Sequence, residues 1–325
     1  MIISYLTYNT HVLLIFQSNY NCKLSKNLSF FVLQMVKIVL LVNQGCFKYH
    51  IPMKYKWLFA ADMDYTLLMP GEDIPEENLR ACHALKEAGV ALTIGTGRSS
   101  FLVGKFADAA GIDVPLITGN GGALFDHKTR KHIYSSDFDP KKAGDMLKKM
   151  LDSRSDATLY STEGIFFTPD SDRRWFCEKY NEGVPEELKA PLFPIDKDTV
   201  NIPPINKFLL QNPDPAMTEA LLKDKDLEVV FSGPSLLDIM TKDTTKGDAL
   251  LKLADFLDIP RENTFAIGDS ENDLSMIRSA RYGIAMGNAD NSIKSAASYV
   301  ACSCEEMGFA DAVYNFVIPK ARGLI

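Results

Sequence analysis

The stretch KWLFAADMDYT, residues 56–66, decides the fold and raises the question of function. Its first part, KWLFAA, is an apolar run that is typical of a strand buried on both faces of a parallel sheet. Asp62 and Asp64 follow directly, two positions apart, and Thr66 stands two positions further on. At ~4 Å and an effective dielectric constant of ~20, two carboxylates repel each other by about 4 kcal/mol. A cation or a bound proton must therefore offset this repulsion.

The composition is that of a globular protein with a sizeable core. The chain has 325 residues, of which 46% are hydrophobic and 24% are charged, and this length predicts about two domains. The net charge of −7 argues against nucleic acid or an anionic membrane as a partner, whereas a small anionic substrate needs only local positive charge. The six cysteines form no CxxC pair, which indicates free thiols and a cytoplasmic location.

The first 52 residues differ in composition from the rest of the chain. They contain four lysines and no Asp or Glu. Their apolar stretch 28–42 is interrupted by Gln34 and Lys37, and it is shorter than the roughly 20 apolar residues that a membrane-spanning helix needs. We therefore expect residues 1–52 to be an extension outside the folded unit, without a membrane anchor. Met53, which precedes basic residues and the first strand, is our hypothesis for the functional start.

Strand and helix patterns alternate after residue 56. The first helical pattern has Pro75 in its first turn and Gly89 at its end, as expected for a helix of this kind. This alternation predicts a parallel sheet with right-handed crossovers. The order is strand 56–61, helix 73–89, strand 90–97, helix 99–111 and strand 114–122.

The pattern changes near Phe125 and changes back near residue 241. Between these points, short strand-like pieces and helical stretches follow one another as in an α+β domain. We therefore predict an α/β protein whose core is a Rossmann-like, doubly wound parallel sheet built from residues 53–125 and 241–325. Residues 126–240 are predicted to form an inserted α+β cap domain.

Polar side chains with suitable chemistry stand where the predicted core strands end or a helix begins. In an open parallel sheet these points meet at one edge, where ligands bind. Four carboxylates with one lysine and two threonine hydroxyl groups make a site for a hard cation such as Mg²⁺, which favours oxygen ligands, and no His or Cys cluster favours a softer metal. Each motif alone also fits a turn, an acidic helix cap or a surface lysine, so the prediction depends on their joint occurrence. The residues are Asp62, Asp64, Thr66, Thr96, Lys246, Asp269 and Asp273.

The order of these motifs resembles that of the haloacid-dehalogenase-like hydrolases, in particular the Cof-type branch with its type IIB cap. The resemblance covers roughly residues 55–318, and the segments ITGNGG (117–122) and AMGNAD (285–290) also match the branch. One departure is the segment CSCEEMGFADAV (302–313), which is usually more polar in the branch. That segment is peripheral to the predicted chemistry.

The resemblance implies that Asp62 is a nucleophile that forms an aspartyl-phosphate intermediate. Asp64 is then the acid that protonates the leaving alcohol and the base that activates water. Dehalogenases of the superfamily lack this acid, and its ion-pumping ATPases carry Thr there, so Asp64 favours a phosphatase or a phosphomutase. Thr96 and Lys246 are implied to hold the phosphoryl group and to neutralise its charge.

The implied ligands surround these catalytic groups. Mg²⁺ is expected on Asp62, the backbone carbonyl of Asp64, Asp269, Asn272 and Asp273. The substrate is expected to contact residues of the same loops, namely Thr66, Gly97, Arg98 and Asn120.

The predicted function is that of a Mg²⁺-dependent phosphatase of small phosphorylated metabolites, of the sugar phosphate, pyridoxal phosphate or flavin mononucleotide class. A phosphomutase, and a non-catalytic binding or regulatory protein on the same fold, are the alternatives. The physiological substrate and the oligomeric state are not predicted.

Overall fold

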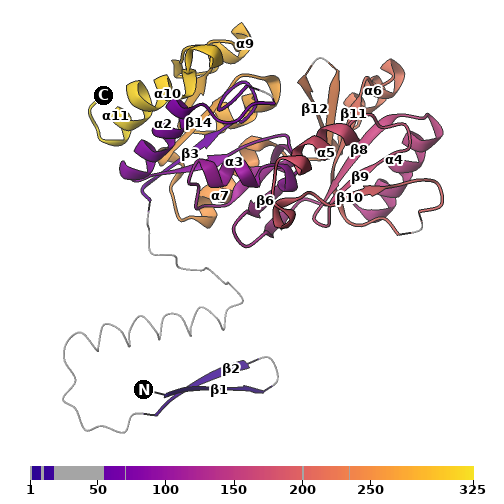
Figure 1. Ribbon diagram of the computed structural model, residues 1–325, viewed down its shortest axis with the longest axis horizontal. Coiled ribbons are helices and arrows are strands. Elements are labelled where there is room, and N and C mark those ends of the chain that lie inside the picture. Colours follow the sequence, from indigo (N-terminus) through magenta and orange to yellow (C-terminus); the bar gives the residue numbers. More distant parts are fainter. Residues whose placement is uncertain (1, 9–10, 18–54, 70, 200, 234) are drawn as a thin grey trace. The chain divides into compact units, whose positions relative to one another are not determined.

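The computed structural model describes residues 2–8, 11–17, 55–69, 71–199, 201–233 and 235–325 (Figure 1). The first two ranges form a unit of their own, in which β1 (Ile2–Tyr8) pairs antiparallel with β2 (His11–Gln17). The stretch 28–42 and Met53 lie outside the described residues, and so do the predictions made for them. Within the described part, no helix combines the length and the apolar character that crossing a membrane requires.

A five-stranded parallel sheet forms the centre of the second unit. Its strand order is β16-β15-β14-β3-β4, and every neighbouring pair is parallel. The central strand β3 contains the apolar run of the sequence, and Leu58, Phe59 and Ala60 are fully buried in it. The predicted doubly wound parallel core is therefore confirmed. The strands are β3 (Trp57–Ala61), β4 (Val90–Ile94), β14 (Thr264–Gly268), β15 (Tyr282–Ala285) and β16 (Tyr299–Val300).

The direction of winding reverses between β3 and β14. The chain leaves β3 through α2 toward β4, and it leaves β14 through α8 in the opposite direction, toward β15. Right-handed crossovers therefore place these two helices on opposite faces of the sheet. Such a reversal opens a crevice at the carboxyl ends of the two strands, which is where α/β proteins bind ligands. The helices of this part are α2 (Glu76–Glu87), α3 (Gly104–Ala109), α7 (Lys246–Phe256), α8 (Leu274–Ser279), α9 (Asn291–Lys294), α10 (Gly308–Ala312) and α11 (Ile318–Ala321).

A small antiparallel sheet extends the core beyond β4. It contains β5 (Leu116–Thr118), β6 (Ala123–Asp126) and β7 (Lys131–Ser135), and a parallel bridge from Gly95 to Ile117 connects it to the end of β4. The strand β7 comes after the change of sequence pattern near residue 125, yet it pairs with β6. The chain therefore enters the next sheet only after residue 135.

A tight turn brings the loop after β5 against the start of α7. Gly121 has a φ of +96°, and a Cβ placed on it would lie 2.1 Å from the carbonyl oxygen of Thr245. Only glycine combines this backbone conformation with so close an approach. The turn fixes the position of Thr245, the residue before Lys246, relative to the edge of the sheet.

A second, six-stranded sheet lies between the two segments of the core along the chain. Its order is β10-β9-β8-β11-β13-β12, and its helices α4, α5 and α6 lie in the same part of Figure 1. Five of the six strand-like stretches read from the sequence and both helical stretches recur here, whereas the first strand-like stretch, KHIYSS (131–136), forms β7 of the small sheet. The helix α5 and the strand β10 were not foreseen. The elements are α4 (Pro140–Asp152), β8 (Asp156–Ser161), β9 (Ile165–Phe167), α5 (Arg174–Glu182), β10 (Leu192–Pro194), β11 (Ile205–Gln211), α6 (Pro215–Lys223), β12 (Leu227–Gly233) and β13 (Leu236–Thr241).

Three hydroxyl groups connect the two chain segments that run between the sheets. Ser136 Oγ lies 2.7 Å from Thr241 Oγ1 and 2.9 Å from Thr244 Oγ1, and the two threonine oxygens are 2.8 Å apart. The outgoing and the returning segment therefore lie side by side.

Candidate active site

A buried lysine joins two of the predicted carboxylates. Lys246 is the first residue of α7, where the side chain of Thr245 caps the helix by accepting from the backbone N–H of Asp248. Its Nζ lies 2.6 Å from Asp62 Oδ1 and 2.6 Å from Asp273 Oδ1, and all three side chains are buried. Burial lowers the pKa of Lys246, but Asp273 and Asp62 raise it by more. The ammonium group therefore stays charged.

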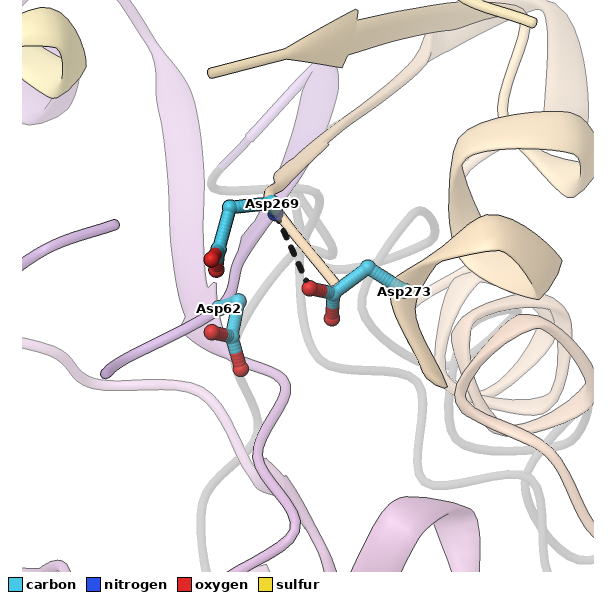
Figure 2. Close-up of side chains that lie close together, drawn as sticks. All are labelled: Asp62, Asp269 and Asp273. Carbon is cyan, nitrogen blue, oxygen red and sulfur yellow. Dashed lines mark hydrogen bonds between the residues drawn. The ribbon is translucent and has the colours of Figure 1, made fainter. Parts of the chain in front are cut away.

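Asp269 completes a cluster of three carboxylates at the ends of β3 and β14 (Figure 2). It directly follows β14, and its carboxylate points toward Asp62. One oxygen from each of the three carboxylates lies within 4.8 Å of the other two. Asp273 Oδ2 also accepts from the backbone N–H groups of Asp269 and Ser270, both at 3.0 Å. Both oxygens of Asp273 thus accept from close protein donors, and the oxygens of Asp269 accept longer hydrogen bonds of 3.2–3.4 Å from Thr66, Ser270 and Asn288.

The charges of this cluster fit a divalent cation. Burial, followed by Asp273, raises the pKa of Asp62 well above its ordinary value, although Lys246 acts in the opposite direction. Burial and Asp273 also raise the pKa of Asp269. One ammonium group therefore does not balance three carboxylates, and a bound divalent cation would supply the missing positive charge. The carboxylate oxygens are the ligand type that hard cations prefer.

Asp64, the second carboxylate of the first motif, is held by Arg98. The guanidinium group donates from Nε to Asp64 Oδ2 at 2.9 Å and from Nη2 to Asp64 Oδ1 at 2.5 Å. It also lies over the rings of Phe106 and Phe176, at 5.4 and 5.2 Å from their centroids. This bidentate contact fixes the orientation of the carboxylate. The role of Arg98 toward substrate stays a prediction, since its partner here is Asp64.

The predicted threonines lie at the same edge of the sheet. Thr66 is fully buried and donates from Oγ1 to Asp269 Oδ1 at 3.3 Å. Thr96 follows the end of β4, is also buried, and accepts from the backbone N–H of Arg98 at 3.1 Å. Both hydroxyl groups therefore shape the loops that surround the carboxylates.

A buried polar chain links the core loops to the six-stranded sheet. Asn120, at a φ of +56°, donates to Asp238 Oδ2 at 2.6 Å and accepts from Asn272 at 3.1 Å. Asp238 Oδ1 lies 2.8 Å from Lys207 Nζ as an ion pair without an aligned hydrogen bond. Lys207 Nζ donates in turn to the carbonyl oxygen of Gly97 at 2.8 Å. The pKa of Lys207 lies below its ordinary value, because the lowering by burial exceeds the raising by Asp238.

Several residues of the predicted site line a cavity of about 240 Å³. Two further predicted residues, Asn120 and Lys246, line a smaller adjoining pocket. Thr66, Asp269 and Asp273 do not line the cavity themselves, but they contact one another or Lys246 beside it. Its wall combines core residues with residues of the six-stranded sheet and α5. The core contributes Asp62, Asp64, Tyr65, Thr96, Gly97, Arg98, Ser270 and Asn272, and the other wall consists of Tyr160, Arg173, Phe176, Lys207, Leu209, Ser232 and Leu236.

The sequence reading named no residue of that second wall. Lys207 carried a usable signal, because it is a lysine directly before the apolar residues FLL (208–210) of a strand-like stretch. Asp238 carried the same signal in LLDIM (236–240). A charged residue at such a position is expected to be paired in the interior. Arg173 and Phe176 carried no comparable signal, since arginine and phenylalanine occur on many helices.

A model of the haloacid dehalogenase-like hydrolase family matches residues 59–313. The chain belongs to this family. The match spans both segments of the core and the six-stranded sheet between them. The family membership predicted from the order of the motifs is therefore confirmed.

This hydrolase matches curated relatives over almost their whole length. The 5-amino-6-(5-phospho-D-ribitylamino)uracil phosphatase YcsE of Bacillus subtilis is 30% identical over 265 residues, which is 80% of this chain and 96% of that protein. The pyridoxal phosphate phosphatase YbhA of Escherichia coli is 25% identical over 268 residues, covering 80% and 98%. Both names describe phosphatases of small molecules.

Solved structures have the same fold. A haloacid dehalogenase-like hydrolase of B. subtilis superimposes with a TM-score of 0.69 at 26% identity, covering 80% of this chain and 99% of that one. A subclass IIB sugar phosphatase of the superfamily superimposes with a TM-score of 0.68 at 23% identity, covering 81% and 99%. The second likeness shows the fold alone, and it agrees with the α/β core and inserted α+β part of this hydrolase.

Proposed function

We propose that this hydrolase is a Mg²⁺-dependent phosphatase of small phosphorylated metabolites that acts through an aspartyl-phosphate intermediate. The observation that carries the proposal is that Asp62 and Asp64 line one cavity, with Lys246 on Asp62 and a cluster of carboxylates beside it. The phosphatase names of its relatives support the reaction class. A cavity of about 240 Å³ suits a small leaving group.

Asp62 is the nucleophile in this proposal. Its carboxylate attacks the phosphorus atom, the bond from phosphorus to the leaving oxygen breaks, and the phosphoryl group becomes attached to Asp62. Lys246, at 2.6 Å from Asp62 Oδ1, favours the ionised, nucleophilic form of the carboxylate, and it offsets the charge of the incoming phosphate. In this proposal, Thr96 and the backbone N–H groups of its loop bind phosphoryl oxygens.

Asp64 is the general acid and the general base of the reaction. It donates a proton to the leaving alkoxide in the first step, and in the second step it accepts one from the water that releases inorganic phosphate from Asp62. Arg98 occupies both oxygens of Asp64 in this structure. One oxygen must therefore turn away from the guanidinium group before it can exchange a proton with the substrate.

Asp62 and Asp269 would hold the metal ion, together with the backbone carbonyl of Asp64. Asn272 and Asp273 would support it from the same loop. When bound, the ion would polarise a phosphoryl oxygen and offset the charge of the carboxylates. Mg²⁺ is our choice because it is bound by a few carboxylates and by substrate phosphate.

Residues 126–240 act as a cap in this proposal and contact the leaving group, because the second wall of the cavity comes from them. The catalytic carboxylates all lie outside this segment. Closing such a segment over a site excludes water from the reaction. A cytoplasmic location and the absence of nucleic acid as a partner stay predictions.

The proposal is tested by hydrolysis of p-nitrophenyl phosphate with release of inorganic phosphate as the readout, which also separates hydrolysis from a mutase reaction. We expect Asp62→Asn to abolish turnover, because the isosteric amide is not a nucleophile. Asp255→Asn, at an exposed position of α7, is the matched control and should keep full activity. Chelation with EDTA should stop the reaction, and Mg²⁺ should restore it better than Ca²⁺, whose coordination is larger and looser.

Turnover by Asp62→Asn above a few percent of wild type would remove Asp62 from the role of nucleophile. Full activity in EDTA would show that the carboxylate cluster does not act through a metal. Both variants are compared with wild type by thermal unfolding, so that a loss of fold is not mistaken for a loss of chemistry.

A further inference from the structure

Three cationic side chains line the cavity, and two of them are already paired. Arg98 forms its bidentate contact with Asp64, and Lys207 forms the buried ion pair with Asp238. Arg173 is the third. Among the residues that the structure describes, no carboxylate oxygen lies within 4.0 Å of its guanidinium group. Arg173 therefore gives the cap side of the cavity one positive charge that no described carboxylate neutralises.

The position of Arg173 is fixed by aromatic contact. It directly precedes α5, and its guanidinium group lies 5.3 Å from the ring centroid of Phe176, the ring that also contacts Arg98 at 5.2 Å. Phe176 therefore holds two guanidinium groups at one wall, only one of which has a carboxylate partner. Arg173 is half-buried, so part of its hydration is lost without replacement.

The two walls of the cavity differ in chemistry, because the core wall contains carboxylates and the second wall contains an arginine and aromatic rings. Asp62 and Asp64 belong to the core wall of the cavity, where the phosphoryl group reacts in the proposed function, and Arg173 belongs to the second wall together with Tyr160 and Phe176. A guanidinium group presents a planar fork of donors that matches a carboxylate or a phosphate. The ring of Phe176 and the ring of Tyr160 offer apolar surface to the body of a leaving group.

We propose, on the basis of the phosphatase function above, that Arg173 binds a second anionic group on the leaving group of the substrate. The substrate class is then a phosphomonoester whose alcohol carries a carboxylate or a second phosphate. Arg173 is a specificity-determining residue in this assignment, since it contacts the part of the substrate that is released.

The test uses substrates that differ only in the second group. 4-Carboxyphenyl phosphate carries the anion, and 4-carbamoylphenyl phosphate is its neutral counterpart of equal size. 1,4-Phenylene bisphosphate replaces the carboxylate by a phosphate, so the two anionic substrates separate the two sources of charge. The readout is kcat/KM for each anionic substrate divided by kcat/KM for the neutral one, compared between wild type and variants, so that differences in leaving-group chemistry cancel.

We expect wild type to favour an anionic substrate and Arg173→Gln to lower this ratio by roughly 10- to 100-fold, the loss typical of one hydrogen bond to a charged group. Arg173→Lys keeps the charge without the planar fork and should give an intermediate ratio. Arg174→Gln is the matched control, because the neighbouring Arg174 is exposed and paired with Glu178 at 2.8 Å. It should leave the ratio at the wild-type value.

Calorimetric binding of 4-carboxyphenyl phosphate to Asp62→Asn and to Asp62→Asn/Arg173→Gln separates the inference from the proposed function. If wild type hydrolyses none of the substrates, the proposed function fails, whereas weaker binding by the double variant still supports an anion site at Arg173. A ratio that Arg173→Gln leaves within about twofold of wild type, or that Arg174→Gln lowers equally, would overturn the inference.

Discussion

The buried ion pair between Lys207 and Asp238 makes a sharp prediction about stability. Lys207 is 1% exposed and Asp238 is fully buried, and Nζ lies 2.8 Å from Oδ1. Lys207→Met keeps an unbranched side chain of similar length but leaves the carboxylate with the Asn120 amide as its one partner among the residues that the structure describes. Removing one member of such a pair typically costs about 3–5 kcal/mol of unfolding free energy. We expect Lys207→Met to fall in this range.

The double variant Lys207→Met/Asp238→Leu separates the charge from the packing. Replacing both partners of a buried pair by apolar side chains is close to neutral on average. The amide of Asn120 would still lose its acceptor, which costs about 1–3 kcal/mol. We therefore expect the double variant to be more stable than Lys207→Met, although less stable than wild type.

Urea unfolding followed by circular dichroism and by fluorescence measures these differences. The matched control is Lys141→Met in α4, because Lys141 and Asp145 form an ion pair at 2.8 Å whose side chains are 84% and 61% exposed. Such exposed pairs contribute about 0.3–0.5 kcal/mol. If Lys207→Met were no more destabilising than Lys141→Met, the reasoning about the buried pair would be refuted.

Three further predictions concern other parts of the chain. Gly121→Ala should lower the melting temperature and kcat, since the added Cβ would lie 2.1 Å from the Thr245 carbonyl oxygen. Thermal unfolding and kinetic assays measure the two effects, and an unchanged melting temperature would contradict the prediction. Burial lowers the pKa of His127 in the folded protein. Below the ordinary histidine pKa of about 6.5, the unfolded chain therefore binds more protons at this residue than the folded protein does. The free energy of unfolding should thus decrease as the pH falls through that value. His127→Gln should reduce this slope in urea midpoints taken at pH 7.5 and 5.5, and an equal slope would refute the assignment. A protein that begins at Met53 should fold and keep full activity in the p-nitrophenyl phosphate assay, and aggregation of this protein would disprove the hypothesis about the extension.

The core was predictable because its signals are local. The apolar run before Asp62 marks a buried strand, and the alternation after it requires a parallel sheet. The carboxyl ends of such strands converge, so Thr96, Lys246 and Asp269 could be expected near Asp62 without any knowledge of contacts. The structure brings these residues to one edge of the sheet, and their catalytic roles stay predictions.

The second wall of the cavity was not predictable in the same way. Tyr160, Phe176, Lys207 and Leu236 come from four different elements, and only the packing of β8, α5, β11 and β13 brings them together. The partner of Arg98 was missed for a related reason. A sequence that places Arg98 after a strand end predicts proximity to the site, but the choice between a phosphate and the Asp64 carboxylate depends on side-chain geometry.

The hydrogen-bonded hydroxyl groups of Ser136, Thr241 and Thr244 have a consequence for modularity. The chain departs from the core and re-enters it at almost the same point, since Ser136 Oγ and Thr244 Oγ1 are 2.9 Å apart. A short loop could therefore replace the intervening segment without changing the order or direction of the core strands. The same geometry would accept a different inserted domain at this point. Evolution could therefore change the leaving-group specificity by replacing the insert, while the core sheet and its carboxylates stay the same.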